Sequence, residues 1–278
     1  QTIQLSGTVG ETVKRSPLSL LVAAVFSFAC CAPIAACEQQ SADCSELGVN
    51  SSDAPTPTNA QSATIVALID LPNNTQDTID KVVNQVYNTI ERELDGTTEF
   101  SLTAGVYTGQ SNNVTTVTCM DGTARSFTYV EGKNNETRQK RERKEYFDST
   151  KKQLENTLAT STHSKSTSGD FRSLLSWSKD KITQNNTGNT KVILWSNFLS
   201  NGIDCLNIET PSSASSALAD EIAQRCQDAD LLPTLGDTDV QVLGSGYGTD
   251  TSLASFSSQL ATAFCKRIST NCRVSQGK

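Results

Sequence analysis

The chain has 278 residues, a formal net charge of −7 and 36% hydrophobic residues. This length leaves room for one domain of roughly 200 residues with a well-buried core, in addition to shorter segments. The acidic balance argues against a nucleic-acid partner, because nucleic acids bind to basic surfaces. It also gives the body of the protein no electrostatic reason to bind anionic lipid.

The first recognisable element is a leader. Lys14 and Arg15 precede an apolar run over 18–31, and small residues stand before Cys37. A short basic region, an apolar core shorter than a membrane span and small residues form the layout of a secretory signal peptide. The sequence Ile-Ala-Ala-Cys that ends at Cys37 resembles the lipobox of bacterial lipoproteins. This resemblance implies that residues 1–36 are removed and that the Cys37 sulfur carries lipid, which anchors the protein on the extracytoplasmic face of the cell membrane.

Residues 37–62 are rich in Ser, Pro, Asn and Thr and contain few large apolar side chains. Such a composition buries too little surface to offset the entropy that ordering would cost. The segment is therefore predicted to be a disordered tether, extended around its Pro-Thr-Pro sequence. The remaining residues, 63–278, are predicted to form the folded domain.

From Ala63 onward, predicted strands alternate with predicted helices. Continuous apolar runs, typical of strands buried on both faces, occur at 64–69 and 191–195. Further strands are expected at 99–107, 114–119 and 240–243, with turns at Asp121-Gly122 and after the last strand. Helical spacing of apolar residues predicts helices at 79–94, 133–158, 171–182, 213–226 and 253–268.

This alternation predicts an α/β fold: a doubly wound, mostly parallel sheet flanked by helices. The strands 99–107 and 114–119, joined by a short polar turn, are expected to form an antiparallel hairpin at one edge of the sheet. Ligands of doubly wound sheets bind beyond the carboxyl ends of the strands, where the strand order reverses. Asp70 and Asn197 follow two of the predicted strands, and Ser168 lies in a loop expected at the same edge.

Four segments resemble the von Willebrand factor A (vWA) family: ALIDLPNNT from Ala67, TSGDFRSLL from Thr167, KVILWSNFLSNG from Lys191 and VQVLGSGYG from Val240. The resemblance covers about Ala63 to Arg267. It implies a metal-ion-dependent adhesion site built from Asp-x-Ser-x-Ser after the first strand, a Thr in a second loop and an Asp after the fourth strand.

The five positions of that site are occupied by Asp70, Pro72, Asn74, Ser168 and Asn197. Only Asp70 matches the family pattern. Ser168 keeps a hydroxyl and Asn74 an amide oxygen, but Pro72 has no side-chain oxygen and Asn197 lacks the carboxylate. Mg²⁺ binds proteins mainly through carboxylates and water. The resemblance therefore implies a degenerate site with at most weak affinity for Mg²⁺ or another divalent cation, and no other cofactor is indicated.

The chain contains nine cysteines. Cys30 and Cys31 belong to the predicted leader, and Cys37 is the predicted lipid attachment point. An even number of remaining cysteines in an exported protein implies disulfides. Short loops favour two local pairs, and elimination leaves a third; the candidates are Cys205–Cys226, Cys265–Cys272 and Cys44–Cys119. A zinc site is disfavoured because the chain has no Cys-x-x-Cys sequence and one histidine.

Other candidate sites have simpler interpretations. The glycines of 244–248 follow the last predicted strand without the spacing of a phosphate-binding loop, so we interpret them as a tight turn with positive φ. His163 lies in a polar stretch without the context of a catalytic triad. The basic residues of 138–144 alternate with glutamates, which favours a solvated helix face over a binding patch.

The first functional hypothesis is a surface-anchored, non-catalytic binding module. Its ligand would be a protein or a component of the cell envelope, bound at the rim around Asp70, Asn74, Ser168 and Asn197. The alternatives are an envelope hydrolase assisted by a metal ion near Asp70, and a scaffold domain that has lost its metal site. The hydrolase alternative lacks a recognisable base or nucleophile in the sequence.

Overall fold

The computed structural model describes residues 49–50, 62–71, 73–107, 114–127, 135–161, 171–184, 189–199 and 215–275. All of them belong to one unit of the chain, 40–278. The predicted leader, Cys37 and most of the predicted tether lie outside the described residues. None of the described helices combines the length and the apolar character needed to cross a membrane.

Seven strands form one sheet in the order β1-β4-β3-β2-β5-β6-β7. Their bounds are Val49–Asn50 (β1), Ser62–Asp70 (β2), Glu99–Tyr107 (β3), Val114–Ser126 (β4), Thr190–Ser196 (β5), Asp239–Leu243 (β6) and Asn271–Val274 (β7). The pairs from β3 through β7 along the sheet are parallel, whereas β4 is antiparallel to β3, and β1 is antiparallel to β4. The prediction of a mostly parallel sheet with an antiparallel hairpin is confirmed. Numbered along the chain, the six longer strands follow the 3-2-1-4-5-6 order of doubly wound folds.

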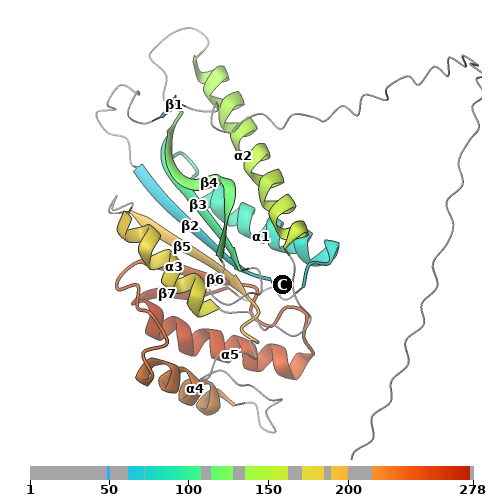
Figure 1. The fold of residues 1–278 in the computed structure, drawn as a ribbon, viewed down its shortest axis with the longest axis vertical. Coiled ribbons are helices and arrows are strands. Elements are labelled where there is room, and N and C mark those ends of the chain that lie inside the picture. Colours follow the sequence, from blue (N-terminus) through green and yellow to red (C-terminus); the bar gives the residue numbers. More distant parts are fainter. Residues whose placement is uncertain are drawn as a thin grey trace, which may run out of the picture. The chain divides into compact units, whose positions relative to one another are not determined.

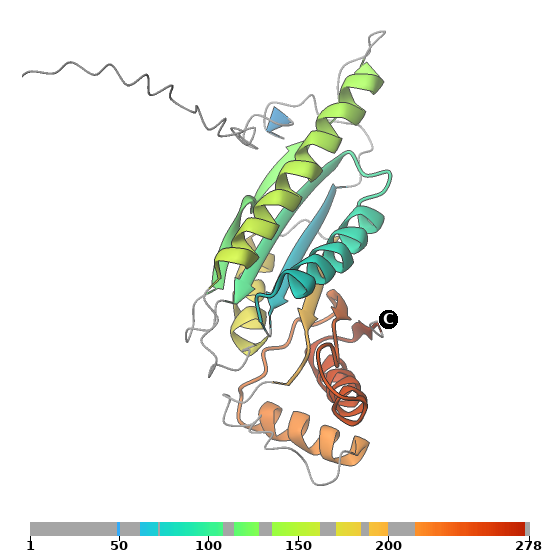
Figure 2. The same ribbon diagram turned by 90° about the vertical axis from the view of Figure 1, so that its right-hand side faces the viewer.

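Five helices cover the two faces of this sheet (Figures 1 and 2). They are Gln76–Glu93 (α1), Asn135–Thr160 (α2), Phe171–Gln184 (α3), Ser216–Asp228 (α4) and Thr251–Ile268 (α5). Buried side chains of α1 and α2 pack together in one cluster, and those of α3, α4 and α5 pack in another. The crossovers therefore place helices on both faces.

The central strand β2 shows why this sheet is buried on both sides. Val66 and Leu68 belong to the cluster under α3, α4 and α5, whereas Ile65, Ala67 and Ile69 belong to the cluster under α1 and α2. Because successive strand residues point to opposite faces, a continuous apolar run fills both clusters.

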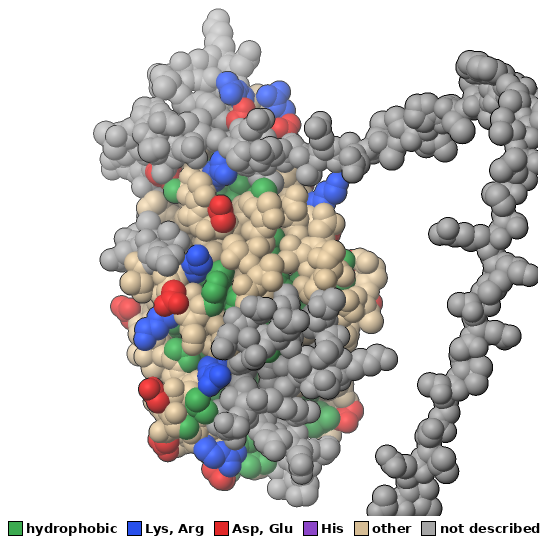
Figure 3. Space-filling view, viewed as in Figure 1, with side chains coloured by type: hydrophobic (Ala, Val, Ile, Leu, Met, Phe, Trp, Pro, Cys, Tyr) green, Lys and Arg blue, Asp and Glu red, His purple; other side chains and the backbone are tan. Residues whose placement is uncertain are grey.

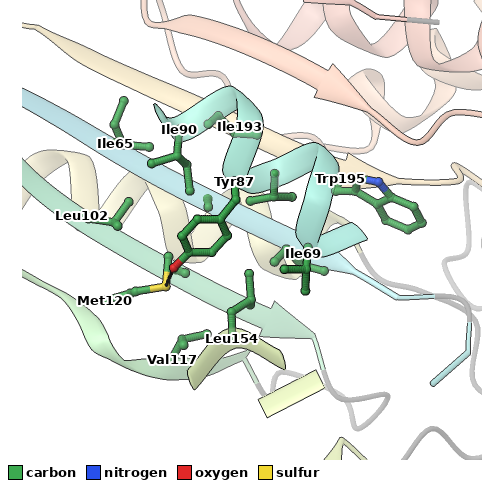
Figure 4. Packing of buried hydrophobic residues seen from close by; sticks show 14 of the residues in the cluster. Ile65, Ile69, Tyr87, Ile90, Leu102, Val117, Met120, Leu154, Ile193 and Trp195 are labelled. Atoms are coloured by element: carbon green, nitrogen blue, oxygen red, sulfur yellow. Dashed lines mark hydrogen bonds between the residues drawn. The ribbon is translucent and has the colours of Figure 1, made fainter. Parts of the chain in front are cut away.

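Tyr87 of α1 lies in the middle of the cluster under α1 and α2 (Figure 4). Its hydroxyl donates a hydrogen bond to Sδ of Met120 at 3.6 Å, across to β4. Leu102 and Leu154 surround the ring from β3 and α2. The helical spacing of apolar residues in α1 thus serves to bury one face of that helix.

The structure changes one predicted boundary: Asp121 and Gly122 do not end a strand, because β4 continues to Ser126. The pairing of β4 with β3 shifts register near these residues. Cys119 and Gly122 have φ of 67° and 93°, and the Ser101 hydroxyl donates to the Gly122 carbonyl at 2.7 Å. The turn-forming residues therefore make an irregular, bulged part of one long strand.

A second correction concerns the end of the fold. The strand 240–243 is not the last one, because β7 follows the closing helix and pairs with β6 in parallel. β7 has only four residues, none of them fully buried. This short edge strand has no apolar run that a sequence pattern would detect.

The surface of α2 agrees with the prediction of a solvated, mixed-charge face. Its ion pairs link residues four positions apart: Lys140 with Glu136, Arg138 with Glu142 and Lys144 with Asp148, at 2.6, 2.7 and 2.5 Å. Figure 3 shows basic and acidic side chains interspersed over the face that it presents. Such pairs on exposed helix faces contribute little to stability individually.

Candidate functional site

The candidate site lies at the carboxyl ends of β2 and β5. These strands are neighbours at the centre of the sheet, and the strand order reverses between them. The crossover from β2 leads toward β3, whereas that from β5 leads toward β6 on the other side. Loops that diverge in this way leave room for a ligand at the strand ends.

Asp70 and Ser196 face each other at this point. They are partners in the parallel register of β2 and β5, and the Ser196 hydroxyl donates to Oδ2 of Asp70 at 2.8 Å. Asp70 is 3% exposed and Ser196 is fully buried. A carboxylate at this depth requires hydrogen-bond donors to offset its lost hydration.

The chain turns sharply after Ser196. The Ser196 Oγ also accepts from the backbone N–H of Phe198 at 3.0 Å, and Phe198 has a φ of 57°. The Phe198 side chain is fully buried and packs against Phe264, with ring centroids 6.2 Å apart. Burial of this ring thus stabilises a backbone conformation that a residue with a Cβ rarely adopts.

Asn197 lies between these two residues and is half-buried. Its Oδ1 accepts from the Leu199 N–H at 3.1 Å, and its backbone carbonyl accepts from the Ser257 hydroxyl of α5. This amide oxygen, at the position where the vWA pattern has a carboxylate, is therefore engaged in an Asx turn. In the chain, Asn197 directly follows Ser196, the register partner of Asp70.

The loop between β2 and α1 has its own hydrogen bonds. Asn73 Oδ1 accepts from the Thr75 N–H at 3.2 Å and from the Thr78 hydroxyl at 2.8 Å, which fixes the start of α1. Asn74 Nδ2 donates to the Ser161 carbonyl at 3.2 Å, at the end of α2. The two remaining predicted positions, Pro72 and Ser168, lie outside the described residues, as do His163 and Cys205.

Within the described ranges, no three His, Cys, Asp or Glu side chains gather as a metal site. At the strand ends the structure supplies one carboxylate, Asp70, whose Oδ2 already binds Ser196. The amide oxygen of Asn197 is likewise engaged. Divalent cations such as Mg²⁺ need several oxygen ligands in a regular arrangement. The described residues alone do not provide such a set.

The glycine loop after β6 has the predicted backbone conformation. Gly244, Gly246 and Gly248 have φ of 78°, 77° and 75°. A Cβ on Gly244 would lie 2.6 Å from the Trp195 ring, and one on Gly246 2.7 Å from the Ala254 backbone. The loop therefore needs glycine for both conformation and close packing. This loop also borders a cavity of about 750 Å³, which no pattern in the sequence predicted.

Four of the six cysteines predicted to form disulfides lie within the described residues. Cys265 and Cys272 form a disulfide between α5 and β7, with their Cα atoms 5.3 Å apart, as their short loop favoured. Cys119 and Cys226 each take part in a disulfide as well. Their predicted partners, Cys44 and Cys205, lie outside the described residues, so those two pairings stay predictions.

Comparisons with known proteins leave the family of this chain open. No family model matches the sequence, and no curated protein matches it. The chain is similar in structure to the human COPII-coat protein Sec24c, with a TM-score of 0.37 and 11% sequence identity over 71% of this chain. The match spans only 28% of the Sec24c chain, and nothing about function is taken from it.

Proposed function

We propose that this protein is a surface-anchored, non-catalytic binding module of the vWA type. Its ligand, a protein or a component of the cell envelope, binds at the carboxyl ends of β2 and β5. The observation that carries the proposal is the buried pair Asp70–Ser196 at the point where the strand order reverses. Ligand sites of doubly wound sheets are found at this position.

Two further features support the proposal. The 3-2-1-4-5-6 strand order with one antiparallel strand agrees with the vWA resemblance of the sequence. The disulfide-bonded cysteines favour an oxidising compartment outside the cytoplasm. Anchoring through a lipidated Cys37 would hold the domain at the cell surface.

The rim can be tested by site-specific photocrosslinking on intact cells. A photoreactive residue replaces Asn74 or Asn197 in the full chain, and a matched one replaces Lys152, which is exposed on α2. We expect covalent adducts with a discrete envelope partner from both rim positions and none from position 152. Adducts of equal yield from all three positions, or none from the rim, would reject the rim as the binding surface.

The metal and the anchor need separate measurements. Calorimetry with Mg²⁺ and Mn²⁺ on the wild type and the Asp70→Asn variant tests the degenerate metal site, and identical flat traces would remove metal from the proposal. Metabolic labelling with palmitate tests the anchor, and we expect label in the wild type and its loss in Cys37→Ser. Label retained in that variant would contradict lipidation of Cys37.

A further inference from the structure

A cavity of about 750 Å³ lies beside the glycine loop, and none of Asp70, Asn74 and Asn197 lines it. Its walls come from α1, α4, α5 and residues 244–248. The helices α4 and α5 lie next to each other in both ribbon views (Figures 1 and 2), and Arg267 of α5 donates to the Asp220 carbonyl of α4. The volume is that of a typical small-ligand site.

Polar side chains line one wall of the cavity. Along α5, the lining residues recur every three or four positions, which places them on one helix face; they are Thr251, Ser255, Ser258, Thr262 and Lys266. This face extends over roughly 22 Å at 1.5 Å per residue. Among the described residues, no Leu, Ile, Val, Phe or Met lines the cavity. The hydroxyl side chains of this wall suit a ligand that carries many hydroxyl or amide groups.

Two glutamines in the walls have unused hydrogen-bonding groups. Gln259 Oε1 is a buried acceptor with no partner among the described residues. Gln85 Oε1 accepts from Trp195 Nε1 at 2.8 Å, which fixes the amide and leaves its NH₂ group as a donor for a ligand. A buried polar atom without a partner costs stability, so a ligand that binds these groups gains from satisfying them.

The cavity is also cationic in an otherwise acidic protein. Lys81 and Lys266 both line it, and neither forms an ion pair with a carboxylate of the described residues. The one lining carboxylate, Asp220, pairs with Arg267 at 3.6 Å. Lys81 lies over the Tyr247 ring, 4.9 Å from its centroid, which holds the ammonium group at the glycine loop.

We infer that this cavity binds an acidic glycan, a chain of sugars that carry carboxylates. Hydroxyl side chains can both donate to and accept from sugar hydroxyls, and the two lysines provide charge-assisted hydrogen bonds to sugar carboxylates. A peptide ligand is less favoured, because no Leu, Ile, Val, Phe or Met lines the cavity to pack against an anchoring side chain. The inference concerns a site separate from the Asp70 rim and does not depend on membrane anchoring.

The test is a titration of the full chain, by calorimetry, with hexagalacturonic acid as the acidic glycan. Maltohexaose provides an uncharged glycan and hexaglutamate an acidic peptide. We expect hexagalacturonic acid to bind most tightly, with about tenfold weaker binding to Lys81→Gln and to Lys266→Gln, the loss expected for one charge-assisted hydrogen bond. Ser255→Trp, at an exposed position of the cavity, should abolish binding.

Lys152→Gln, which removes an exposed lysine of α2, is the matched control and should bind like the wild type. A thermal melt of each variant verifies that it is folded. The inference is overturned if hexagalacturonic acid does not bind, if Ser255→Trp binds it as well as the wild type does, or if hexaglutamate binds equally well. Loss of binding in these variants with an intact Asp70 rim would support it, whatever the rim binds.

Discussion

Arg143 of α2 joins the end of α1 to the core. Its Nη1 donates to the Thr97 carbonyl, and its Nη2 donates to the Leu94 carbonyl at 2.5 Å. The guanidinium lies over the rings of Phe100 and Phe147, 5.7 and 5.4 Å from their centroids. One side chain therefore satisfies carbonyls at a helix terminus and also stacks on two aromatic rings.

We predict that Arg143→Ala lowers the free energy of unfolding by about 2–3 kcal/mol. The Thr97 carbonyl loses the Arg143 donor, the Leu94 carbonyl keeps only the Thr97 N–H, and the rings lose the cation. Arg143→Lys should cost less than Arg143→Ala, since the ammonium group keeps the charge and part of the hydrogen bonding, although it lacks the planar guanidinium. Urea unfolding measures both. The control is Arg141→Ala, whose exposed pair with Glu145 at 3.7 Å should be worth less than about 0.5 kcal/mol. Equal midpoints for the two alanine variants would contradict the role of Arg143.

Ser196 stabilises the turn after β5. Its hydroxyl donates to Asp70 and accepts from the Phe198 N–H. Ser196→Ala should therefore reduce the free energy of unfolding by about 1–3 kcal/mol, the cost of leaving a buried polar group without its partner. Thr183→Ala, which removes an exposed hydroxyl from α3, should stay within about 0.5 kcal/mol of the wild type. A Ser196→Ala midpoint equal to that of Thr183→Ala would show that the hydroxyl is dispensable.

At the scale of single residues, the sequence predicted only those neighbours in space that follow from chain connectivity and strand direction. Asp70 and Asn197 follow neighbouring strands, so their shared edge follows from the α/β pattern. The bond from Asn74 to Ser161 spans 87 positions and depends on where α2 ends, which no local pattern encodes. The cavity combines Lys81 with Gln259, from two helices far apart in the chain.

At the scale of elements, β7 depends on a covalent link. The disulfide Cys265–Cys272 joins it to α5, seven positions apart in the chain. Backbone hydrogen bonds add to this link, from Thr270 N–H to the Gly236 carbonyl and from Ser275 N–H to the Val242 carbonyl, at 3.0 and 2.8 Å. The strand itself has only four residues and contributes little buried surface.

Replacing both Cys265 and Cys272 by Ala should lower the free energy of unfolding by about 2–3 kcal/mol, the estimate for a short closed loop. We also expect hydrogen exchange in 271–274 to become faster than in the wild type, because the edge strand loses its tether, and exchange in β5 to change less. Exchange mass spectrometry of the two segments measures this difference. Unchanged exchange in 271–274 would mean that backbone hydrogen bonds alone hold β7.

The elements that the sequence predicted well are those with long apolar patterns. β2 and β5 are continuous apolar runs, and α1 has helical spacing of buried residues. β7 escaped prediction because its pairing rests on backbone bonds and a disulfide. In β4, the sequence Asp121-Gly122 correctly indicated an irregular backbone with positive φ at Gly122. It did not end the strand, because pairing with β3 resumes beyond it.

At the scale of the whole molecule, the sheet separates two apolar clusters, and the one under α1 and α2 contains two deeply buried tyrosines. Tyr87 and Tyr146 are 2% and 1% exposed. Tyr87 donates to Met120, and Tyr146 donates to the Cys119 carbonyl at 3.0 Å. Burial raises the pKa of both phenols above the usual value, because a phenolate would be desolvated there.

These two pKa values predict a loss of stability in alkali. Above about pH 10 the tyrosines ionise in the unfolded chain but stay protonated in the folded one, so the unfolded state binds fewer protons. The contribution of these two tyrosines to the free energy of unfolding should therefore be constant below this pH. Above it, the free energy should fall by up to about 1.4 kcal/mol per pH unit for each tyrosine, until the folded-state pKa is reached.

The variant with both Tyr87→Phe and Tyr146→Phe separates this effect from other alkaline processes. It should be less stable than the wild type near neutral pH, because two buried hydrogen bonds are lost, yet its stability should fall less steeply above pH 10. Urea unfolding at a series of pH values, with short exposure to limit disulfide exchange, measures both slopes. Parallel slopes for the variant and the wild type would show that the alkaline loss arises elsewhere in the protein.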